Sequence, residues 1–504
     1  TTADRNTALG NSAMAACTTG ADNVAVGAFA LDAALTGSFN TAVGSYCLGA
    51  NTTGANNVAV GYAALDANTT GQENTALGQA AMTANTTSSY NTAVGSQSCA
   101  NMTGQNNTAV GRASLYTCTT GTQNVAIGGD CLFDLTTADA NTALGHNAGY
   151  NVTTGGYNVL LGYYAGVNIT TGIKNVAVGQ NTLRTATGGS YNTGLGDQAL
   201  YDYTGSETVA IGHATAYELT TGNQCTAVGT SALRNSTTGD YSVAVGYYAL
   251  GSANVTGDGN TAVGYRAGEN ITTGTINTLF GYRSGNALTT GAENTFIGDN
   301  AGDACTTGNT NIALGRHAYG QAGGGNNNIC IGHAAGYELG STSYNVLVGN
   351  NAGRSTAPGG TLNSDDNIVI GDNNATNAYI KIDWTVTSDG RDKTDVESFT
   401  HGLSWINKLR PVTYRWDMRS NYENGIPDGS KKESKLSIGL IAQEELEVEK
   451  EHGYGDTPDN MIISHLSEDG NQYGIQYSKL VPVLINAVKE LSAEVEQLKS
   501  KLNN

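Results

Sequence analysis

The chain has 504 residues, of which 68 are glycine and only 13% are charged, and its formal net charge is −19. Because an acidic chain with few lysines has little means of neutralising phosphates, we do not expect it to bind nucleic acid. No apolar run approaches twenty residues and glycine does not recur at every third position, so neither a membrane-spanning helix nor a collagen-like triple helix is expected.

A short motif repeats along residues 1–371. A stretch of the Asn-Thr-Ala-Val type followed by glycine occurs 22 times, from Asn6–Gly10 through Asn23–Gly27 to Asn367–Gly371. Up to Gly349 most steps are seventeen residues, with occasional steps one shorter or one longer. A period held over so many units predicts stacked coils, each of which buries its apolar residues against its neighbours.

Each coil reads as two short strands and two turns. Val, Ile, Thr and Leu stand beside Asn-Gly and Thr-Gly pairs, which are typical of strands joined by tight turns. We therefore predict an all-β rod, a parallel β-solenoid or β-roll with alanine inside and Thr and Val outside. At about 4.8 Å per coil the rod is roughly 100 Å long. Repeated Asn and Gly are expected to form asparagine ladders and positive-φ corners.

Three residue types leave alternatives open. Tyrosines beside the corner glycines and before the strand asparagines form either a sugar-binding face or packing between coils or protomers. They are Tyr62, Tyr163, Tyr164, Tyr247, Tyr248, Tyr265 and Tyr282, and Tyr90, Tyr157, Tyr191, Tyr241 and Tyr344. Asn-x-Thr/Ser turns are plain turn residues, or glycan acceptors if the source glycosylates. The eight cysteines, all in the repeats, are expected to be free buried thiols.

Composition changes after the repeats. All three tryptophans and all five prolines lie in the last third of the chain, from Pro358 onward. We therefore divide the chain into a shaft at 1–371, a linker at 372–387 and a second domain at 388–504. Because Thr1–Gly10 aligns position for position with Thr18–Gly27, the chain starts in mid-coil, and we expect further sequence upstream.

The repeats over residues 1–371 resemble the Asn-Ser-Val-Ala-Ile-Gly repeats of trimeric autotransporter adhesin heads, which form β-rolls bundled three around an axis. Similar seventeen-residue repeats occur in phage tail-fibre-like proteins. The resemblance implies a trimeric rod and does not identify a ligand.

Residues 384–504 carry a second set of motifs. These are Thr387–Lys393 (TSDGRDK), Leu409–Trp416, Gly439–Glu444, Tyr477–Pro482 and Leu484–Leu491. Together they resemble the intramolecular chaperone of phage tail spikes and fibres, the S74 peptidase family. The resemblance implies a small α+β chaperone domain that trimerises, templates the folding of the fibre ahead of it and then cuts itself off.

Carried over onto this chain, the resemblance places the scissile bond between Thr387 and Ser388. Ser388 is then the nucleophile and Lys393 its base, while Asp389 orients the pair or holds the loop. The family usually has an apolar residue where this chain has Asp392, and a carboxylate there makes the lysine a poorer base. The domain is at most an autoproteolytic serine peptidase with a single turnover, and we expect no cofactor or metal.

The last segment, about residues 478–502, predicts a helix with an apolar heptad seam. Its members are Val481, Leu484, Val488, Leu491, Val495, Leu498 and Leu502. Val at one core position and Leu at the other favour two strands, so the trimer is implied by the family and not by the seam. The alternative is a single amphipathic helix packed on its own domain.

These features indicate the structural shaft of a phage tail fibre, assembled in the host cytoplasm and carried on the virion. Expected partners are two further copies of the chain, a host-surface glycan or protein receptor, and baseplate or other fibre proteins through an upstream region. A cellular surface adhesin or extracellular filament using the same chaperone is the alternative. A glycan-degrading tailspike is disfavoured because acids such as Glu73, Glu207 and Glu293 are scattered.

Overall fold

The computed structural model describes residues 3–355, 362–372, 375, 378–379, 381, 385–467 and 470–503. It comprises two compact units, Thr1–Thr310 and Asn311–Asn504, each of which is described by itself. Thr1, Thr2, Pro358, Trp384 and much of the predicted linker at 372–387 lie outside the described residues.

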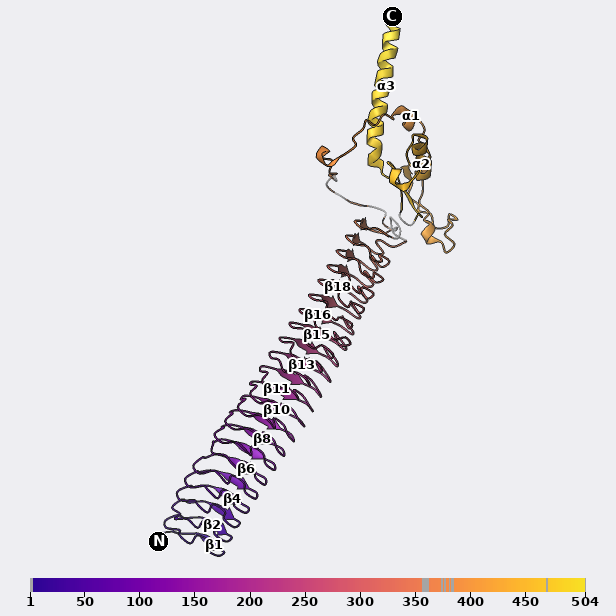
Figure 1. Cartoon of the computed structure of the whole chain (residues 1–504). Helices are drawn as coiled ribbons and strands as arrows, with labels where there is room; N and C mark the ends of the chain where they lie inside the picture. Colours follow the sequence, from indigo (N-terminus) through magenta and orange to yellow (C-terminus); the bar gives the residue numbers. More distant parts are fainter. Residues whose placement is uncertain are drawn as a thin grey trace. The chain divides into compact units, whose positions relative to one another are not determined.

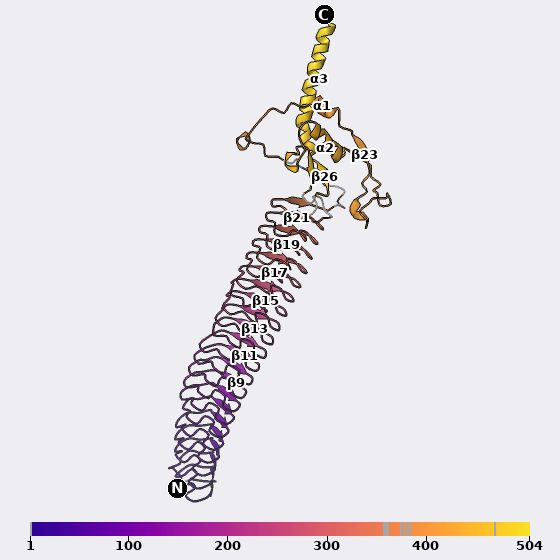
Figure 2. The same cartoon turned by 45° about the vertical axis from the view of Figure 1, so that its right-hand side comes forward.

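The repeats form a parallel β-solenoid of 22 short strands among the described residues, as predicted (Figures 1 and 2). In the first unit the strands are β1 Thr7–Leu9, β2 Val24–Val26, β3 Thr41–Val43, β4 Val58–Val60, β5 Thr75–Leu77, β6 Thr92–Val94, β7 Thr108–Val110, β8 Val125–Ile127, β9 Thr142–Leu144, β10 Val159–Leu161, β11 Val176–Val178, β12 Thr193–Leu195, β13 Val209–Ile211, β14 Thr226–Val228, β15 Val243–Val245, β16 Thr261–Val263, β17 Thr278–Phe280 and β18 Thr295–Ile297. The second unit continues with β19 Ile312–Leu314, β20 Ile329–Ile331, β21 Val346–Val348 and β22 Ile368–Ile370.

Neighbouring strands pair in parallel and in register. Thr142 lies opposite Val159, for example, and Val159 opposite Val176. The middle residue of almost every strand is buried and is usually alanine, whereas the two flanking residues point outward. This alternation follows from the two-residue period of a strand, and the predicted placement of alanine inside is correct.

Each coil contains one strand, so the prediction of two strands per coil is wrong. The second half of a coil is a chain of turns, in which two residues that follow each corner glycine adopt left-handed backbone angles. In the coil after Gly61 these residues are Ala63 and Leu65, both at φ 54°. A left-handed residue breaks the extended conformation, so this half of the coil turns where a strand was expected.

The corner glycines are required by the close stacking of the coils. Gly162 has φ 141°, and a Cβ atom on it would lie 2.4 Å from the carbonyl oxygen of Gly179 in the next coil. Any larger residue would meet backbone that is unable to move away without breaking the stack. The predicted positive-φ corners are therefore correct.

A buried asparagine ladder runs beside the strands. Asn158 donates its backbone N–H to Asn141 Oδ1 at 3.0 Å and its Nδ2 to the Gly172 carbonyl at 3.0 Å. Its own Oδ1 accepts the backbone N–H of Asn175 at 2.9 Å. Since buried polar groups must be paired, each such asparagine satisfies a backbone donor and a backbone acceptor of neighbouring residues.

The ladder is interrupted at three consecutive coils, where Thr208, Cys225 and Ser242 replace asparagine. Thr208 Oγ1 still accepts the backbone N–H of Cys225, at 3.3 Å. The hydroxyl of the buried Tyr203 donates to Thr208 Oγ1 at 2.8 Å and so fills the space that an amide would occupy. A small hydroxyl can thus replace part of the amide's function.

Large and small residues exchange places inside the coils. Where the strand centre is Leu160 instead of alanine, the facing positions of two neighbouring coils are Gly149 and Gly166. A Cβ atom on either glycine would lie within 2.7 Å of a Leu160 methyl carbon. Glycine at these two positions therefore leaves room for the larger side chain of Leu160, as close packing requires.

The left-handed positions make a stability prediction. Ala140 has φ 59°, and the equivalent residue of a later coil is Gly259. Because an alanine in this conformation costs about 1 kcal/mol relative to glycine, Ala140→Gly should raise the free energy of unfolding by roughly 0.5–1 kcal/mol. Chemical denaturation measures it. The matched change Ala143→Gly, in the buried centre of β9, should lower stability by a similar amount, and equal effects of both changes would contradict the argument.

The second unit ends in a small α+β fold. Its elements are η1 Gly390–Asp392, α1 Leu403–Ile406, β23 Val412–Tyr414, η2 Arg419–Asn421, β24 Ser437–Gly439, α2 Ala442–Glu451, η3 Pro458–Asn460, β25 Ser464–Leu466, β26 Tyr473–Ile475, η4 Tyr477–Lys479 and α3 Leu480–Leu502. β23 pairs with β24, and β25 with β26, both antiparallel. Trp405, Val448, Ile463, Leu480 and Val483 form the core.

Side chains of the repeats behave largely as structural residues. Tyr247, Tyr265 and Tyr282 stack on one another in consecutive coils, with ring centroids 5.4 and 5.2 Å apart. All eight cysteines are free, and all except the half-buried Cys17 are buried. Asn51 is buried, its Nδ2 donating to the Gly54 carbonyl at 3.0 Å, so this Asn-x-Thr turn does not present an amide to solvent.

Candidate functional site

The serine and lysine predicted to carry the chemistry are brought together by a single turn. Lys393 Nζ donates a hydrogen bond to Ser388 Oγ at 2.6 Å. Between them lies η1, a one-turn helix whose last backbone bond runs from the Lys393 N–H to the Gly390 carbonyl. Because η1 is a single turn, it places the side chains of Ser388 and Lys393 on the same side of the loop.

Asp389 holds this turn. Its Oδ1 accepts the Arg391 backbone N–H at 2.9 Å, and its Oδ2 accepts Arg391 Nη2 at 2.6 Å. These hydrogen bonds from Arg391 lower the pKa of Asp389 below its ordinary value. Of the two predicted roles, the geometry therefore matches holding the loop, since the carboxylate pairs with Arg391 and not with the lysine.

The whole loop is open to solvent. Thr387, Ser388, Asp392 and Lys393 are all exposed. The structure therefore brings the nucleophile and base into contact without enclosing them.

Helix α3 has two apolar faces. One face, Leu480, Val483 and Ala487, is buried against the α+β fold. Glu490 reaches from α3 to the start of α1, where it accepts the Leu403 backbone N–H at 2.6 Å. The predicted seam residues lie on the other face, with exposed fractions from 40% at Val495 to 82% at Leu502. The helix thus packs on its own domain and also leaves the seam uncovered in the single chain.

Two buried glutamates on α2 were not predicted from the sequence. Glu449 Oε1 accepts the backbone N–H of Ile462, at 3.0 Å, and of Ile463 and Ser464. Glu445 is 1% exposed and accepts Trp405 Nε1 at 3.3 Å, while its Oε2 is buried without a partner. Burial raises the pKa of Glu445 to about 7, and repulsion by Glu449 adds to the effect.

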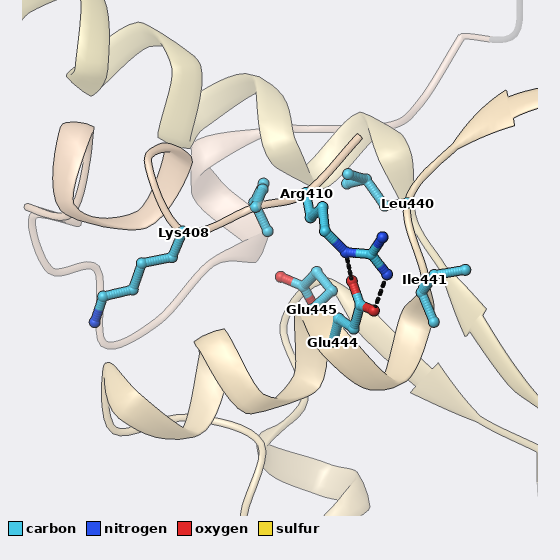
Figure 3. Close-up of a pocket in the computed structure, with 7 residues that line it drawn as sticks. Lys408, Arg410, Leu440, Ile441, Glu444 and Glu445 are labelled. Atoms are coloured by element: carbon cyan, nitrogen blue, oxygen red, sulfur yellow. Dashed lines mark hydrogen bonds and ion pairs between the residues drawn. The ribbon is translucent and has the colours of Figure 1, made fainter. Parts of the chain in front are cut away.

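Glu445 also lines a small surface pocket (Figure 3). Its other walls come from Lys408, Arg410, Leu440, Ile441 and Glu444, and Figure 3 shows Arg410 paired with Glu444 across it. That ion pair lowers the pKa of Glu444, the opposite direction from its neighbour Glu445. The one sequence signal for the buried pair is its i, i+4 spacing on α2.

Neither a metal site nor a membrane-spanning helix is found within the described ranges. No group of three or more His, Cys, Asp and Glu side chains there could hold a metal ion. In the same part of the chain, no helix is long and apolar enough to cross a membrane.

Comparison with known proteins agrees with this arrangement. A search of curated proteins finds no match to the chain. Residues 388–454, which begin at the predicted nucleophile, match the family model Peptidase_S74, described as chaperone of endosialidase. The chain therefore joins a parallel β-solenoid of seventeen-residue coils to a C-terminal part in which residues 388–454 are similar to the Peptidase_S74 chaperone family.

Proposed function

We propose that this chain is the shaft of a phage tail fibre, and that its C-terminal segment is a self-cleaving chaperone that trimerises the chains and sets their register. The observation that carries the proposal is the succession of a long solenoid and a segment matching the endosialidase chaperone family. The shaft and chaperone together fit a fibre-like or tailspike-like protein.

The solenoid has a register problem that such a chaperone solves. The strand centres are mostly alanine, and nearly every coil carries the same asparagine and glycine positions. Three chains that associate through such coils gain almost as much stabilisation when they are slipped by one coil as when they are aligned. Since non-local pairing of this kind is also slow, a terminal clamp that aligns the chains first removes the slipped alternatives.

The proposed reaction is an intramolecular acyl transfer. Lys393, once it has lost a proton, accepts the hydroxyl proton of Ser388, and Ser388 Oγ attacks the carbonyl carbon of Thr387. The Thr387–Ser388 C–N bond breaks, the Ser388 nitrogen takes a proton, and an ester joins Thr387 to Ser388 Oγ. Water then hydrolyses the ester to leave a Thr387 carboxylate and a Ser388 hydroxyl with a free amino group.

Assembly is proposed to complete this site. Ser388 and Lys393 touch but are exposed in the single chain, and the seam on α3 is exposed as well. Burying the seam between three helices brings three chaperone segments together, which would enclose the loop and favour the neutral lysine. Cleavage would then follow assembly, so that only aligned shafts are released.

The same proposal assigns the partners and the location. Three copies of the chain form the shaft in the host cytoplasm, and the fibre is carried on the virion. It reaches a glycan or protein on the host surface and joins the baseplate or other fibre proteins.

Denaturing mass spectrometry of the recombinant protein tests the chemistry. The wild type is expected to yield two pieces, one ending at Thr387 and one beginning at Ser388. Ser388→Ala removes the nucleophile and should slow cleavage by more than about 10³-fold. Lys393→Arg keeps the positive charge but provides no usable base, so it should remain whole while still forming a trimer in native mass spectrometry. An intact wild-type trimer would rule out self-cleavage and leave the segment as a trimerisation domain only.

A further inference from the structure

We infer that the outward face of strands β1–β18 is the surface through which copies of this chain meet, coil against coil. This inference rests on the proposed homotrimer and adds which face of the shaft is covered in it. We call this surface the strand face, and define it as the first and third residues of β1–β18.

The strand face carries no charge anywhere along the first unit. Its first positions are all Thr or Val, and its third positions are all Leu, Val, Ile or Phe, in eighteen consecutive strands. Large apolar side chains on it are open to solvent in the single chain: Leu144 is 50% and Phe280 55% exposed. A soluble chain rarely exposes an apolar surface so continuous unless something covers it.

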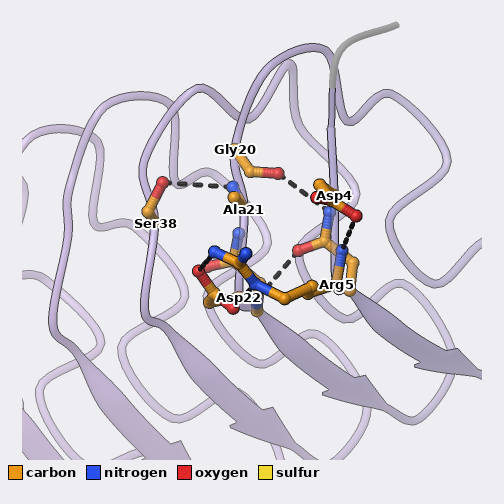
Figure 4. A network of polar contacts seen from close by, with 8 residues as sticks. Asp4, Arg5, Gly20, Ala21, Asp22 and Ser38 are labelled. Carbon is orange, nitrogen blue, oxygen red and sulfur yellow. Dashed lines mark hydrogen bonds and ion pairs between the residues drawn. The ribbon is translucent and has the colours of Figure 1, made fainter.

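Charges begin at the edge of this face. The residue before each strand asparagine is variable and includes the ion-paired Arg5 and Asp22, joined by bonds of 2.6 and 2.7 Å (Figure 4). The same column contains Lys174 and exposed tyrosines such as Tyr157 and Tyr191. An apolar centre with a polar, tyrosine-rich rim is the anatomy of a protein–protein interface.

The dimensions of the strand face favour another copy of the chain as its occupant. Three residues span about 10 Å and eighteen coils about 86 Å, so the face covers roughly 860 Å². A stable interface uses about 800 Å² per partner. Only a second solenoid presents side chains at the same interval over this whole length, so that each Leu or Ile on one copy can sit between those of the other. An anionic membrane surface is disfavoured as the occupant, because the shaft is itself acidic and would be repelled by it.

Thiol labelling of two cysteine variants tests the inference. Leu144→Cys lies on the strand face, whereas Thr171→Cys lies on an exposed turn of the second half-coil. Both are made with Cys17→Ser, since the other native thiols are buried. In the assembled protein, maleimide should modify Leu144→Cys at least tenfold more slowly than Thr171→Cys. Equal rates in a protein that native mass spectrometry shows to be trimeric would overturn the strand face alone, whereas a monomeric wild type would overturn the proposed trimer as well.

Charge insertion provides an independent measurement. The pair Leu144→Glu and Leu195→Glu buries two carboxylates in the proposed interface and should lower the assembled fraction at least tenfold at a given concentration. Its matched control is Thr171→Glu with Thr221→Glu, which adds the same charge on exposed turns. Because the variant side chains point outward, circular dichroism should show an unchanged fold. Equal assembled fractions for the two variants would overturn the inference.

Discussion

Replacing Asn158 by leucine is expected to open the solenoid locally around β9–β11. The change leaves the backbone N–H of Asn175 without its acceptor and the Gly172 carbonyl without its donor. Each buried unpaired group costs about 1–3 kcal/mol, so a loss of about 3 kcal/mol is expected in these coils. Since coils contact only their neighbours, the loss stays local. Hydrogen exchange of amides near β9–β11 should accelerate about 100-fold, with β3–β5 unaffected.

The natural interruptions of the ladder supply the control for this experiment. Asn158→Thr places at this position the residue found at Thr208, whose Oγ1 accepts the next backbone N–H. Asn158→Thr should accelerate exchange less than Asn158→Leu, because the backbone N–H of Asn175 keeps an acceptor and only the Gly172 carbonyl loses its partner. If leucine and threonine gave the same exchange rates, the ladder would not be a source of stability.

Glu445→Gln is expected to stabilise the C-terminal fold above pH 7. It should also remove most of the stability that the fold loses as the pH rises from 5 to 8. The folded-state pKa of Glu445 is raised to about 7, so the stability associated with its protonated form is fully present below about pH 4.5 and is lost as the pH rises through 7. A pKa shift of this size corresponds to a loss of about 3 kcal/mol in the free energy of unfolding at pH 8. Glutamine stays neutral and can still accept Trp405 Nε1.

Denaturant unfolding at pH 5 and pH 8, followed by tryptophan fluorescence, measures this effect. All three tryptophans lie after the repeats and Trp405 lies in the core of the C-terminal fold, so a change in Trp405 fluorescence reports on that fold and not on the first unit. Glu444→Gln is the control, because Arg410 lowers the pKa of Glu444 and its contribution is lost as the pH falls. A wild type equally stable at both pH values would show that Glu445 is charged in the folded state without penalty.

Much of the solenoid could be predicted from the sequence because its signals are repeated. The strict period predicts stacked coils, and the alternation around alanine predicts strands with alanine inside. The repeated glycines predict positive-φ corners. The number of strands per coil could not be predicted, because Ala63 and Leu65 adopt left-handed angles that neither residue type favours. Stacking on neighbouring coils imposes those angles, and a single coil carries no local sign of them.

The candidate site shows a similar division. The resemblance to the S74 family predicted Ser388 and Lys393 as a pair, although their spacing alone predicts nothing, and the structure brings the two side chains into contact. The preference of Asp389 for Arg391 depends on the turn that η1 forms, and so it could not be predicted. The burial of Glu445 and Glu449 was missed because α2 reads as a charged surface helix. Only the fold reveals that Ile462, Ile463 and Ser464, at the start of β25, supply the backbone donors that make burial of Glu449 tolerable.

The exchange of large and small core residues bears on how such a shaft can change length in evolution. Leu160 requires glycine in the preceding coil and in its own, at Gly149 and Gly166, and Leu279 likewise lies against Gly268 and Gly285. Recombination between similar repeats adds or removes whole coils. A breakpoint between Leu160 and its glycines would bring together residues that do not fit. Leucine facing leucine would clash, and glycine facing alanine would leave a void. Breakpoints are therefore tolerated between coils of the same core type, which makes the alanine-centred stretches the places where the fibre can lengthen or shorten.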